Sequence, residues 1–380
     1  MSAANKNRDK TVQTLARKKT AKERAAMRGA LLAWYDAAGR TLPWRVRPED
    51  RAKGIIPNPY AVWLSEIMLQ QTTVAHATPY WRAFLARFPT VIDLARADRD
   101  EVLAMWAGLG YYARARNLHK CAGVVRDEHK GVFPATEAEL LKLPGIGAYT
   151  AATIAAICHD EATTIVDGNV ERVISRIFMA QTPLPKGKTE LRNFAALLSE
   201  PKLPSFERPG DYGQAVMDLG ATVCTPRSPA CDMCPWAEFC AARKLGVQTD
   251  YPKKTPKKKT PIRYGAVFVL KSGEAVLLQR RSDKGLLGGM MGFPGTPWGD
   301  LPSHAEVMAA QPAVRNWEKS SLEVKHVFTH FELRLTVYSA EIAGSSKTDI
   351  TLPDPIWATL AHIKDYALPT VMTKVLKAAL

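Results

Sequence analysis

Four of the six cysteines lie close together and could bind a metal. Their spacing is C-x6-C-x2-C-x5-C, formed by Cys224, Cys231, Cys234 and Cys240. Zinc and an iron–sulfur cluster both accept four thiolates, so the spacing leaves these two open. Paired disulfides are the third interpretation, and the lack of an apolar secretory segment in the first thirty residues counts against it.

Glu66 is an acidic residue within an apolar segment. Pro59 favours a helix start, and the following apolar residues would cover most of that helix: Tyr60, Trp63, Leu64, Ile67, Met68 and Leu69. Burial disfavours the charged form of a carboxyl group, so Glu66 could hold a proton at neutral pH, as a general acid must. A surface glutamate paired with a basic group is the alternative interpretation.

Asp167 precedes an amphipathic segment in which Val170, Val173, Ile174 and Ile177 recur at helical spacing. This pattern predicts that Asp167 is the N-cap, where an ionised carboxylate accepts backbone N–H groups. Capping alone is a sufficient reason for an aspartate there. A protonated Glu66 with an ionised Asp167 would also supply the acid and the anion that glycosidic cleavage through an oxocarbenium-like state requires.

A glycine-rich turn, LPGIGAYT at residues 143–150, separates two further helical segments. Gly145 and Gly147 tolerate positive φ and close approach, so backbone N–H groups beside a helix N-terminus can point at a phosphate. The turn therefore predicts a helix–hairpin–helix DNA-binding element. An ordinary helix–helix connection is the alternative.

The charge of the chain favours a polyanionic partner. The 380 residues include 52 basic and 37 acidic side chains, which leaves a net charge of +15. Nucleic acid is the partner class that this imbalance favours. With 46% apolar residues and no apolar run of about eighteen, we expect a cytoplasmic monomer of two to three domains without a membrane partner.

Changes in composition divide the chain into four parts. Residues 1–24 predict a basic tail, and residues 25–243 predict an all-α domain that includes the cysteine loop at 224–240. Residues 244–263, rich in Pro and Lys, predict a linker that is either simply solvated or in contact with phosphate. Residues 264–380 predict an α+β domain, with a hairpin around 271–274, alternating apolar residues over 331–337 and a final helix over 369–380.

Several motifs, in this order, resemble the MutY family of adenine DNA glycosylases, within the helix–hairpin–helix (endonuclease III) superfamily. They are SEIMLQQT at 65–72, GLGYYARARNL at 108–118, LPGIGAYT at 143–150, VDGNV at 166–170 and the cysteine loop, so the similarity spans roughly residues 25–240. A weaker similarity covers about 262–380. There, HVFTHF at 326–331 is similar to the segment that recognises 8-oxoguanine in the family's C-terminal domain.

The resemblance implies base excision repair of double-stranded DNA that contains adenine opposite 8-oxoguanine or guanine, with a [4Fe–4S] cluster on the four cysteines. Glu66 matches the acid that protonates adenine at ring nitrogen seven and later assists the water, and Asp167 matches the carboxylate that stabilises the sugar cation or adds to it. Asn169 matches a neighbouring pocket residue. Gln70 and Tyr111 match residues inserted into the duplex around 8-oxoguanine, and the adenine must be extruded to be reached.

Tyr149 occupies a hairpin position that carries a lysine in bifunctional relatives such as endonuclease III. That lysine attacks the sugar as an amine, forms a Schiff base and cuts the strand. A phenol cannot form an imine, so the resemblance implies a monofunctional glycosylase with Tyr149 as a hydrogen-bonding pocket residue. Packing of Tyr149 on the hairpin without a further role is the alternative.

The C-terminal domain resembles a Nudix hydrolase fold, whose chemistry depends on a Glu-rich helix that binds Mg²⁺. After GFPG at 292–295 the next acidic residues are only Asp300 and Glu306, so we expect no hydrolysis of phosphate esters.

Phe328, Thr329 and His330 then become a recognition element that wedges a base step and hydrogen-bonds a modified purine. A plain strand entry is the alternative. The family often has serine where Thr329 stands, so the hydroxyl is kept.

Two other functions are open at this stage. A mismatch thymine glycosylase can share an aspartate and a hairpin tyrosine, but Glu66 in its Gln-Gln-Thr context and the appended domain count against it. A non-catalytic DNA-binding or redox-sensing protein would use only the cluster and the hairpin, and the presence of both carboxylates counts against it.

Overall fold

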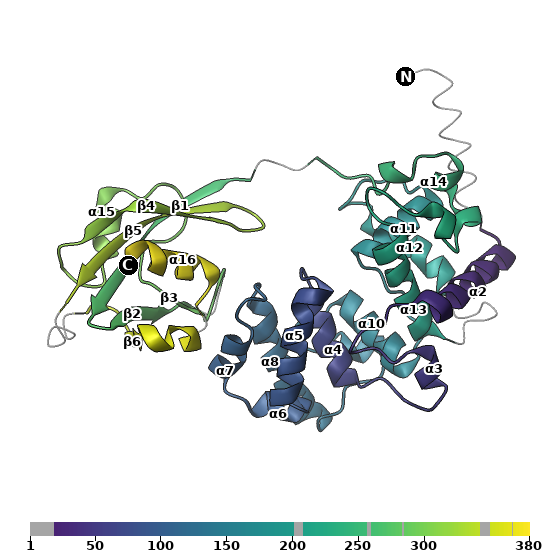
Figure 1. The fold of residues 1–380 in the computed structure, drawn as a ribbon, viewed down its shortest axis with the longest axis horizontal. Coiled ribbons are helices and arrows are strands. Elements are labelled where there is room, and N and C mark those ends of the chain that lie inside the picture. Colours follow the sequence, from purple (N-terminus) through teal and green to yellow (C-terminus); the bar gives the residue numbers. More distant parts are fainter. Residues whose placement is uncertain (1–18, 201–207, 257–259, 283–284, 343–349, 367) are drawn as a thin grey trace, which may run out of the picture. The chain divides into compact units, whose positions relative to one another are not determined.

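The computed structural model describes residues 19–200, 208–256, 260–282, 285–342, 350–366 and 368–380 (Figure 1). The chain divides into two compact units, Met1–Gln70 with Val124–Pro256 and Gln71–Gly123 with Lys257–Leu380. Most of the expected basic tail, residues 1–18, lies outside the described residues. Helix α2 begins at Ala21, within the expected tail, because Thr20 and Glu23 form a capping box.

The described residues of the predicted all-α range 25–243 are helical, but residues 71–123 of that range belong to the second unit. The first unit is helical. Its elements are α2 (Ala21–Ala38), α3 (Pro48–Arg51), α4 (Pro59–Leu69), α9 (Glu137–Leu140), α10 (Ala148–His159), α11 (Gly168–Phe178), α12 (Lys188–Leu198), α13 (Pro209–Asp218), the π-helical η1 (Leu219–Val223), η2 (Cys231–Met233), η3 (Ala237–Phe239), α14 (Ala241–Lys244) and η4 (Gln248–Asp250). Helix α8 (Ala113–His129) contributes residues to both units.

Helix α10 is central to the first unit. Its residues from Thr150 to Ile157 are all buried, as expected of a helix that is apolar on every side. It packs on α13 and α4, and α13 in turn packs on α2. The two helices that carry Glu66 and Tyr149 are therefore neighbours in one core, which fixes their side chains relative to each other.

The second unit combines helices with a mixed sheet. Its elements are α5 (Val74–Arg87), α6 (Val91–Arg96), α7 (Arg99–Met105), β1 (Ile262–Ser272), β2 (Ala275–Arg280), β3 (Met291–Gly292), α15 (His304–Ala309), β4 (Glu318–Val327), β5 (Glu332–Glu341), β6 (Ile356–Thr359), η6 (Leu360–Tyr366) and α16 (Thr370–Ala379). No helix in the described ranges is long and apolar enough to cross a membrane.

The sheet confirms the predicted α+β character of residues 264–380. Its strand order is β3-β2-β1-β5-β4, with β6 paired to β2, and only the β1–β5 pair among these is parallel. The predicted hairpin joins β1 and β2 at Ser272 and Ala275, with Gly273 at a φ of 57°. The alternating residues Leu333, Leu335 and Val337 are fully buried, and α16 packs over them.

The linker is shorter than the predicted range 244–263. Tyr251 is buried against the first unit, and Leu184 exchanges backbone hydrogen bonds with Lys253 and Thr255 at 2.8 and 3.0 Å. Burial of the Tyr251 ring therefore attaches the first half of the Pro- and Lys-rich segment to the helical core. Residues 257–259 lie outside the described residues, and β1 begins at Ile262.

Candidate functional site

Glu66 lies on α4, a helix whose start is set by local residues. Pro59 is its first residue, and the side chain of Asn58 caps it by accepting from the N–H of Tyr60 at 2.9 Å. Six of the ten residues after Pro59 are apolar and buried, and Glu66, which lies among them, is only 7% exposed. The predicted burial of this carboxyl group is confirmed.

Burial raises the pKa of Glu66 to about 7. The Tyr149 hydroxyl and the Arg45 guanidinium oppose this effect, whereas the nearby Asp167 carboxylate adds to it. A carboxyl group with a pKa near neutrality is substantially protonated at physiological pH and can act as a general acid.

Asp167 is the N-cap of α11, as predicted. One carboxylate oxygen accepts from the N–H of Val170 at 2.7 Å, and the other accepts from the Asn169 amide at 2.9 Å. Both oxygens are thus held in place, beside the positive end of the helix dipole. The Asp167 carboxylate is partly exposed, and it lies close enough to Glu66 for its charge to act on that group.

Tyr149 joins the two carboxyl groups. It is the second residue of α10, and its hydroxyl donates to Met217 Sδ at 3.3 Å. Burial, together with the charges of Glu66 and Asp167, raises the pKa of the Tyr149 phenol well above its ordinary value. The structure therefore brings together three residues predicted from separate motifs and keeps the phenol as a neutral hydrogen-bond donor.

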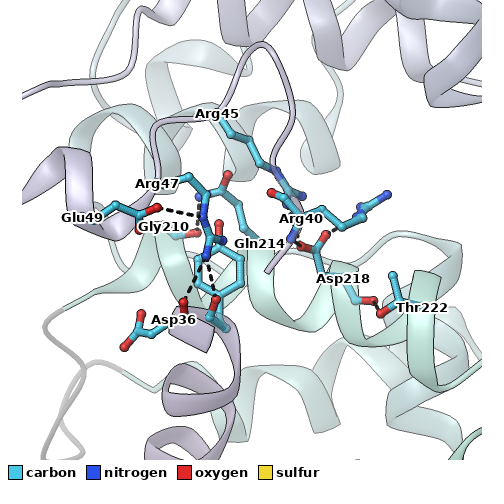
Figure 2. A network of polar contacts seen from close by, with 10 residues as sticks. Asp36, Arg40, Arg45, Arg47, Glu49, Gly210, Gln214, Asp218 and Thr222 are labelled. Atoms are coloured by element: carbon cyan, nitrogen blue, oxygen red, sulfur yellow. Dashed lines mark hydrogen bonds and ion pairs between the residues drawn. The ribbon is translucent and has the colours of Figure 1, made fainter. Parts of the chain in front are cut away.

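Arg45, whose charge acts on Glu66, belongs to an ion-pair network with Arg40 and Asp218. None of these three residues was among the predicted site residues. Asp218, at the end of α13, accepts from Arg45 Nη1 at 2.7 Å and from Arg40 Nε at 2.6 Å (Figure 2). Burial raises the pKa of Asp218, but the two guanidinium groups outweigh burial and leave it below its ordinary value. The network holds the cationic Arg45, which limits the upward shift of Glu66.

Helix α11 connects Asp167 with the cysteine loop. Asn169 accepts a hydrogen bond from Arg172 Nη2 at 2.8 Å, and Arg172 Nε donates to the Cys224 carbonyl at 2.7 Å. One turn later, Arg176 Nη1 donates to Cys224 Sγ at 3.2 Å. The same helix thus orients the candidate catalytic carboxylate and holds one of the predicted ligands.

The four predicted cysteine ligands line one cavity, together with Trp236 and Arg176. In the described parts of the chain, no three His, Cys, Asp or Glu side chains group closely enough to hold a single metal ion. Four thiolates around one cavity fit an iron–sulfur cluster, in which each thiolate binds its own iron. Burial raises the pKa of Cys234 to about 12, so cluster assembly must displace its proton.

We expect Cys231→Ala to lower the iron content and the visible absorption of the purified protein, because one ligand is lost. Cys158→Ala is the matched control, since Cys158 lies on α10 and does not line the cavity. Iron content and absorption spectra of the two variants test this expectation. Equal iron loss in both would contradict the ligand assignment.

The predicted DNA-binding hairpin joins α9 to α10. Gly145 has a φ of 75°, and exposed Gly147 caps α10 without a side-chain hydrogen bond. Leu143 and Ile146 are buried and anchor the turn. Backbone N–H groups at the start of α10 therefore remain available for an anion such as phosphate.

The second unit brings Tyr111 and Thr329 together, although 218 residues separate them in sequence. Tyr111 is 50% exposed at a φ of 48°, and its hydroxyl lies 2.8 Å from Thr329 Oγ1. Arg114 Nη2 donates to the Leu109 carbonyl at 2.8 Å and so supports the loop that presents Tyr111. A bulky residue in the left-handed region is strained, which is common at functional positions.

The three predicted recognition residues lie at the β4–β5 turn, which the Phe328 N–H closes by donating to the Phe331 carbonyl at 2.8 Å. Phe328 packs on Phe331, with ring centroids 5.0 Å apart, whereas Thr329 and His330 are exposed. Gln70 ends α4 in the first unit.

Comparison with known proteins identifies matches over both units. Residues 64–197 match the HhH-GPD superfamily of base excision DNA repair proteins, residues 224–240 match the iron–sulfur binding domain of endonuclease III, and residues 266–378 match the NUDIX domain. The cysteine loop is therefore the site of a [4Fe–4S] cluster.

Similarity over most of the chain is also found. Human adenine DNA glycosylase is 34% identical, covering 93% of this chain and 74% of the human protein. The adenine DNA glycosylase of Buchnera aphidicola subsp. Schizaphis graminum is 30% identical, covering 91% and 96%, respectively. The solved structure of a thermostable thymine-DNA glycosylase, at 24% identity and a TM-score of 0.50, covers 59% of this chain and 98% of its own and shares the fold.

Proposed function

The chain belongs to the adenine DNA glycosylase family, and on that premise we propose that it removes adenine paired with 8-oxoguanine or guanine in double-stranded DNA. The observation that carries the proposal is the convergence of Glu66, Tyr149 and Asp167 in one core. A buried carboxyl group of raised pKa beside a second, hydrogen-bonded carboxylate is the arrangement that cleavage of a glycosidic bond requires.

In this mechanism Glu66 donates its proton to ring nitrogen seven of the extruded adenine. Protonation weakens the bond between the base and the sugar, so adenine leaves with the bonding electrons. Asp167 stabilises the positive charge that develops on the sugar. The ionised Glu66 then accepts a proton from the attacking water, and the products are adenine and an abasic site.

Tyr149 makes the proposed reaction monofunctional. A neutral phenol cannot form a Schiff base with the sugar, and its raised pKa keeps the proton on oxygen. Its hydroxyl donates to Met217 Sδ, and the phenol lies close enough to both carboxyl groups for their charges to raise its pKa. The strand should therefore stay intact after adenine is released.

The described contacts also support a site that recognises the base opposite the adenine. Tyr111 and Thr329 present neighbouring hydroxyl groups on exposed loops, and the Phe328 ring supports the second loop from the core side. Exposed donors and acceptors beside an aromatic ring suit recognition of a modified purine edge in duplex DNA. The hairpin at Gly145 and Gly147 would bind the phosphate backbone of the DNA without a preference for its sequence.

We expect Thr329→Ala to lower the rate of adenine release opposite 8-oxoguanine by roughly three- to tenfold, the usual value of one hydrogen bond. Release opposite guanine should change less, because guanine lacks the C8 oxygen and N7 proton of 8-oxoguanine. Single-turnover assays with the two duplexes measure the ratio.

Thr359→Ala provides the control, since Thr359 is an exposed threonine at the end of β6 in the same unit. An equal loss of rate on both duplexes would show that Thr329 does not distinguish 8-oxoguanine from guanine. No release of adenine from either duplex by the wild type would overturn the proposed function itself.

A further inference from the structure

The hydroxyl of Tyr149 donates its proton to a sulfur atom. Met217 Sδ accepts this hydrogen bond, with 3.3 Å between oxygen and sulfur. A phenol has a single proton to donate, and a thioether is among the weak acceptors in proteins. The proposed reaction assigns no role to this sulfur. A proton that is donated to the sulfur is not donated to a carboxyl oxygen, so Met217 affects the groups that carry out the reaction.

The position of Met217 is fixed by its surroundings. Met217 lies on α13 and is only 7% exposed. Helix α13 packs on α10, and Tyr149 of α10 packs against the apolar core that contains Met217. The next residue, Asp218, is held by Arg45 and Arg40. Close packing therefore keeps the sulfur within reach of the hydroxyl.

Titratable groups from three helices surround the same hydroxyl. Glu66 on α4 and Asp167 at the start of α11 act on Tyr149 with negative charge, and Arg45 acts on Glu66 with positive charge. The Cys158 thiol on α10 stays uncharged, because burial raises its pKa to about 12. Burial raises the pKa of Glu66 to about 7, and the Tyr149 hydroxyl opposes this rise.

The direction of that opposition matters for the acid role of Glu66. A donor that points at a carboxyl group favours its ionised form. A Tyr149 hydroxyl that stayed on Glu66 would therefore reduce the protonated form that must protonate adenine. A weak acceptor beside the hydroxyl removes this effect, and Met217 Sδ is such an acceptor.

We propose that Met217 is a positioning residue for the reaction, on the premise of the proposed function: its sulfur holds the Tyr149 hydroxyl in the resting protein, and the hydroxyl turns to the Glu66 carboxylate once Glu66 has protonated adenine. The movement needs only rotation about the bond between the phenol ring and its oxygen. It exchanges a weak acceptor for an ionised one, and a hydrogen bond to a charged group is roughly twice as strong as a neutral one. The stronger bond forms only as the carboxylate forms, so it lowers the barrier without stabilising the resting state.

Direct titration of Glu66 tests the proposal without relying on adenine release. The full chain, isotope-labelled at its glutamate carboxyl carbons, is titrated by NMR, and Glu66→Gln identifies the signal. Met217→Leu keeps the volume of the side chain but removes the acceptor, so the hydroxyl turns to Glu66 permanently. We expect the pKa of Glu66 to fall by about half a pH unit or more, which is roughly a threefold change in its protonation equilibrium.

Two comparisons separate this effect from a general loss of packing. Met179→Leu is the matched control, because Met179 follows α11 in the same apolar core and is also 7% exposed. It should leave the pKa of Glu66 unchanged. Met217→Leu combined with Tyr149→Phe should titrate like Tyr149→Phe alone, since Met217 acts only through the Tyr149 hydroxyl.

An unchanged pKa of Glu66 in Met217→Leu would overturn the proposal, as would an equal fall in Met179→Leu or in the Tyr149→Phe background. The decline of adenine release with rising pH should begin at a lower pH in Met217→Leu than in the wild type. Absence of adenine release from the wild type would refute the proposed function, whereas the titration would still decide whether Met217 controls the ionisation of Glu66.

Discussion

Replacement of Asp167 by asparagine should reduce single-turnover adenine release by roughly a thousandfold, while binding of the duplex is retained. The reason is that the sugar cation loses the charge that stabilises it, and removal of one preorganised electrostatic group from an active site commonly costs two to three orders of magnitude. A thousandfold loss corresponds to about 4 kcal/mol of transition-state stabilisation.

The fold should tolerate Asp167→Asn, because asparagine caps helices about as well as aspartate and can still accept from the Val170 N–H. Asp98→Asn is a matched control, since Asp98 caps α7 in the same way, accepting from the Asp100 N–H at 2.7 Å. Release rates and duplex affinities should be measured for both variants. Near-normal adenine release by Asp167→Asn would show that this carboxylate acts only as a helix cap.

Replacement of Glu66 by glutamine should lower adenine release by roughly a hundred- to ten-thousandfold, the range attributed to a positioned general acid. Glutamine keeps the shape of the side chain, but it cannot donate a carboxylic proton. Duplex binding should persist. Glu171→Gln, on α11 in the same unit, removes a glutamate that pairs with Lys188 at 3.5 Å and serves as the control.

The pH dependence provides a second test of Glu66. Burial raises its pKa to about 7, so the proton-donating form predominates below that value and is lost as pH rises through it. The wild-type rate of base release should therefore fall as pH rises through about 7, whereas the residual rate of Glu66→Gln should not show this step. A wild-type rate that increases over the same range would indicate that Glu66 acts as a base in the limiting step.

The residues that could be predicted are those whose signals are local. The helix start at Pro59, the cap at Asp167, the buried circumference of α4 and the alternation along β5 each depend on neighbours within a few positions, so short windows of sequence contain them. The α+β character of residues 264–380 also followed from local runs and one hairpin turn, but the mixed sheet did not. Its parallel β1–β5 pair, in contrast, joins residues about seventy positions apart and carries no local signal.

The remaining features depend on tertiary contacts. Arg45 and Asp218 are far apart in the chain, and each looks like an ordinary charged residue until α13 brings them together. The contact between Tyr111 and Thr329 arises in the same way. The linker is shorter than predicted because the Tyr251 ring is buried against the first unit. The Pro- and Lys-rich composition of the segment does not indicate this burial. Cysteine spacing alone could not distinguish zinc from a cluster, since both accept four thiolates, and the match of residues 224–240 to an iron–sulfur binding domain makes the distinction.

The most direct test is single-turnover incubation with a duplex that holds adenine opposite 8-oxoguanine, analysed with and without alkali, beside a duplex that holds thymine opposite guanine. We expect free adenine, strand breaks at the adenine position only after alkali, and no thymine release. Breaks without alkali would contradict the monofunctional role of Tyr149. Thymine release, or no release from either duplex, would contradict the assignment of Glu66 and Asp167 to adenine excision.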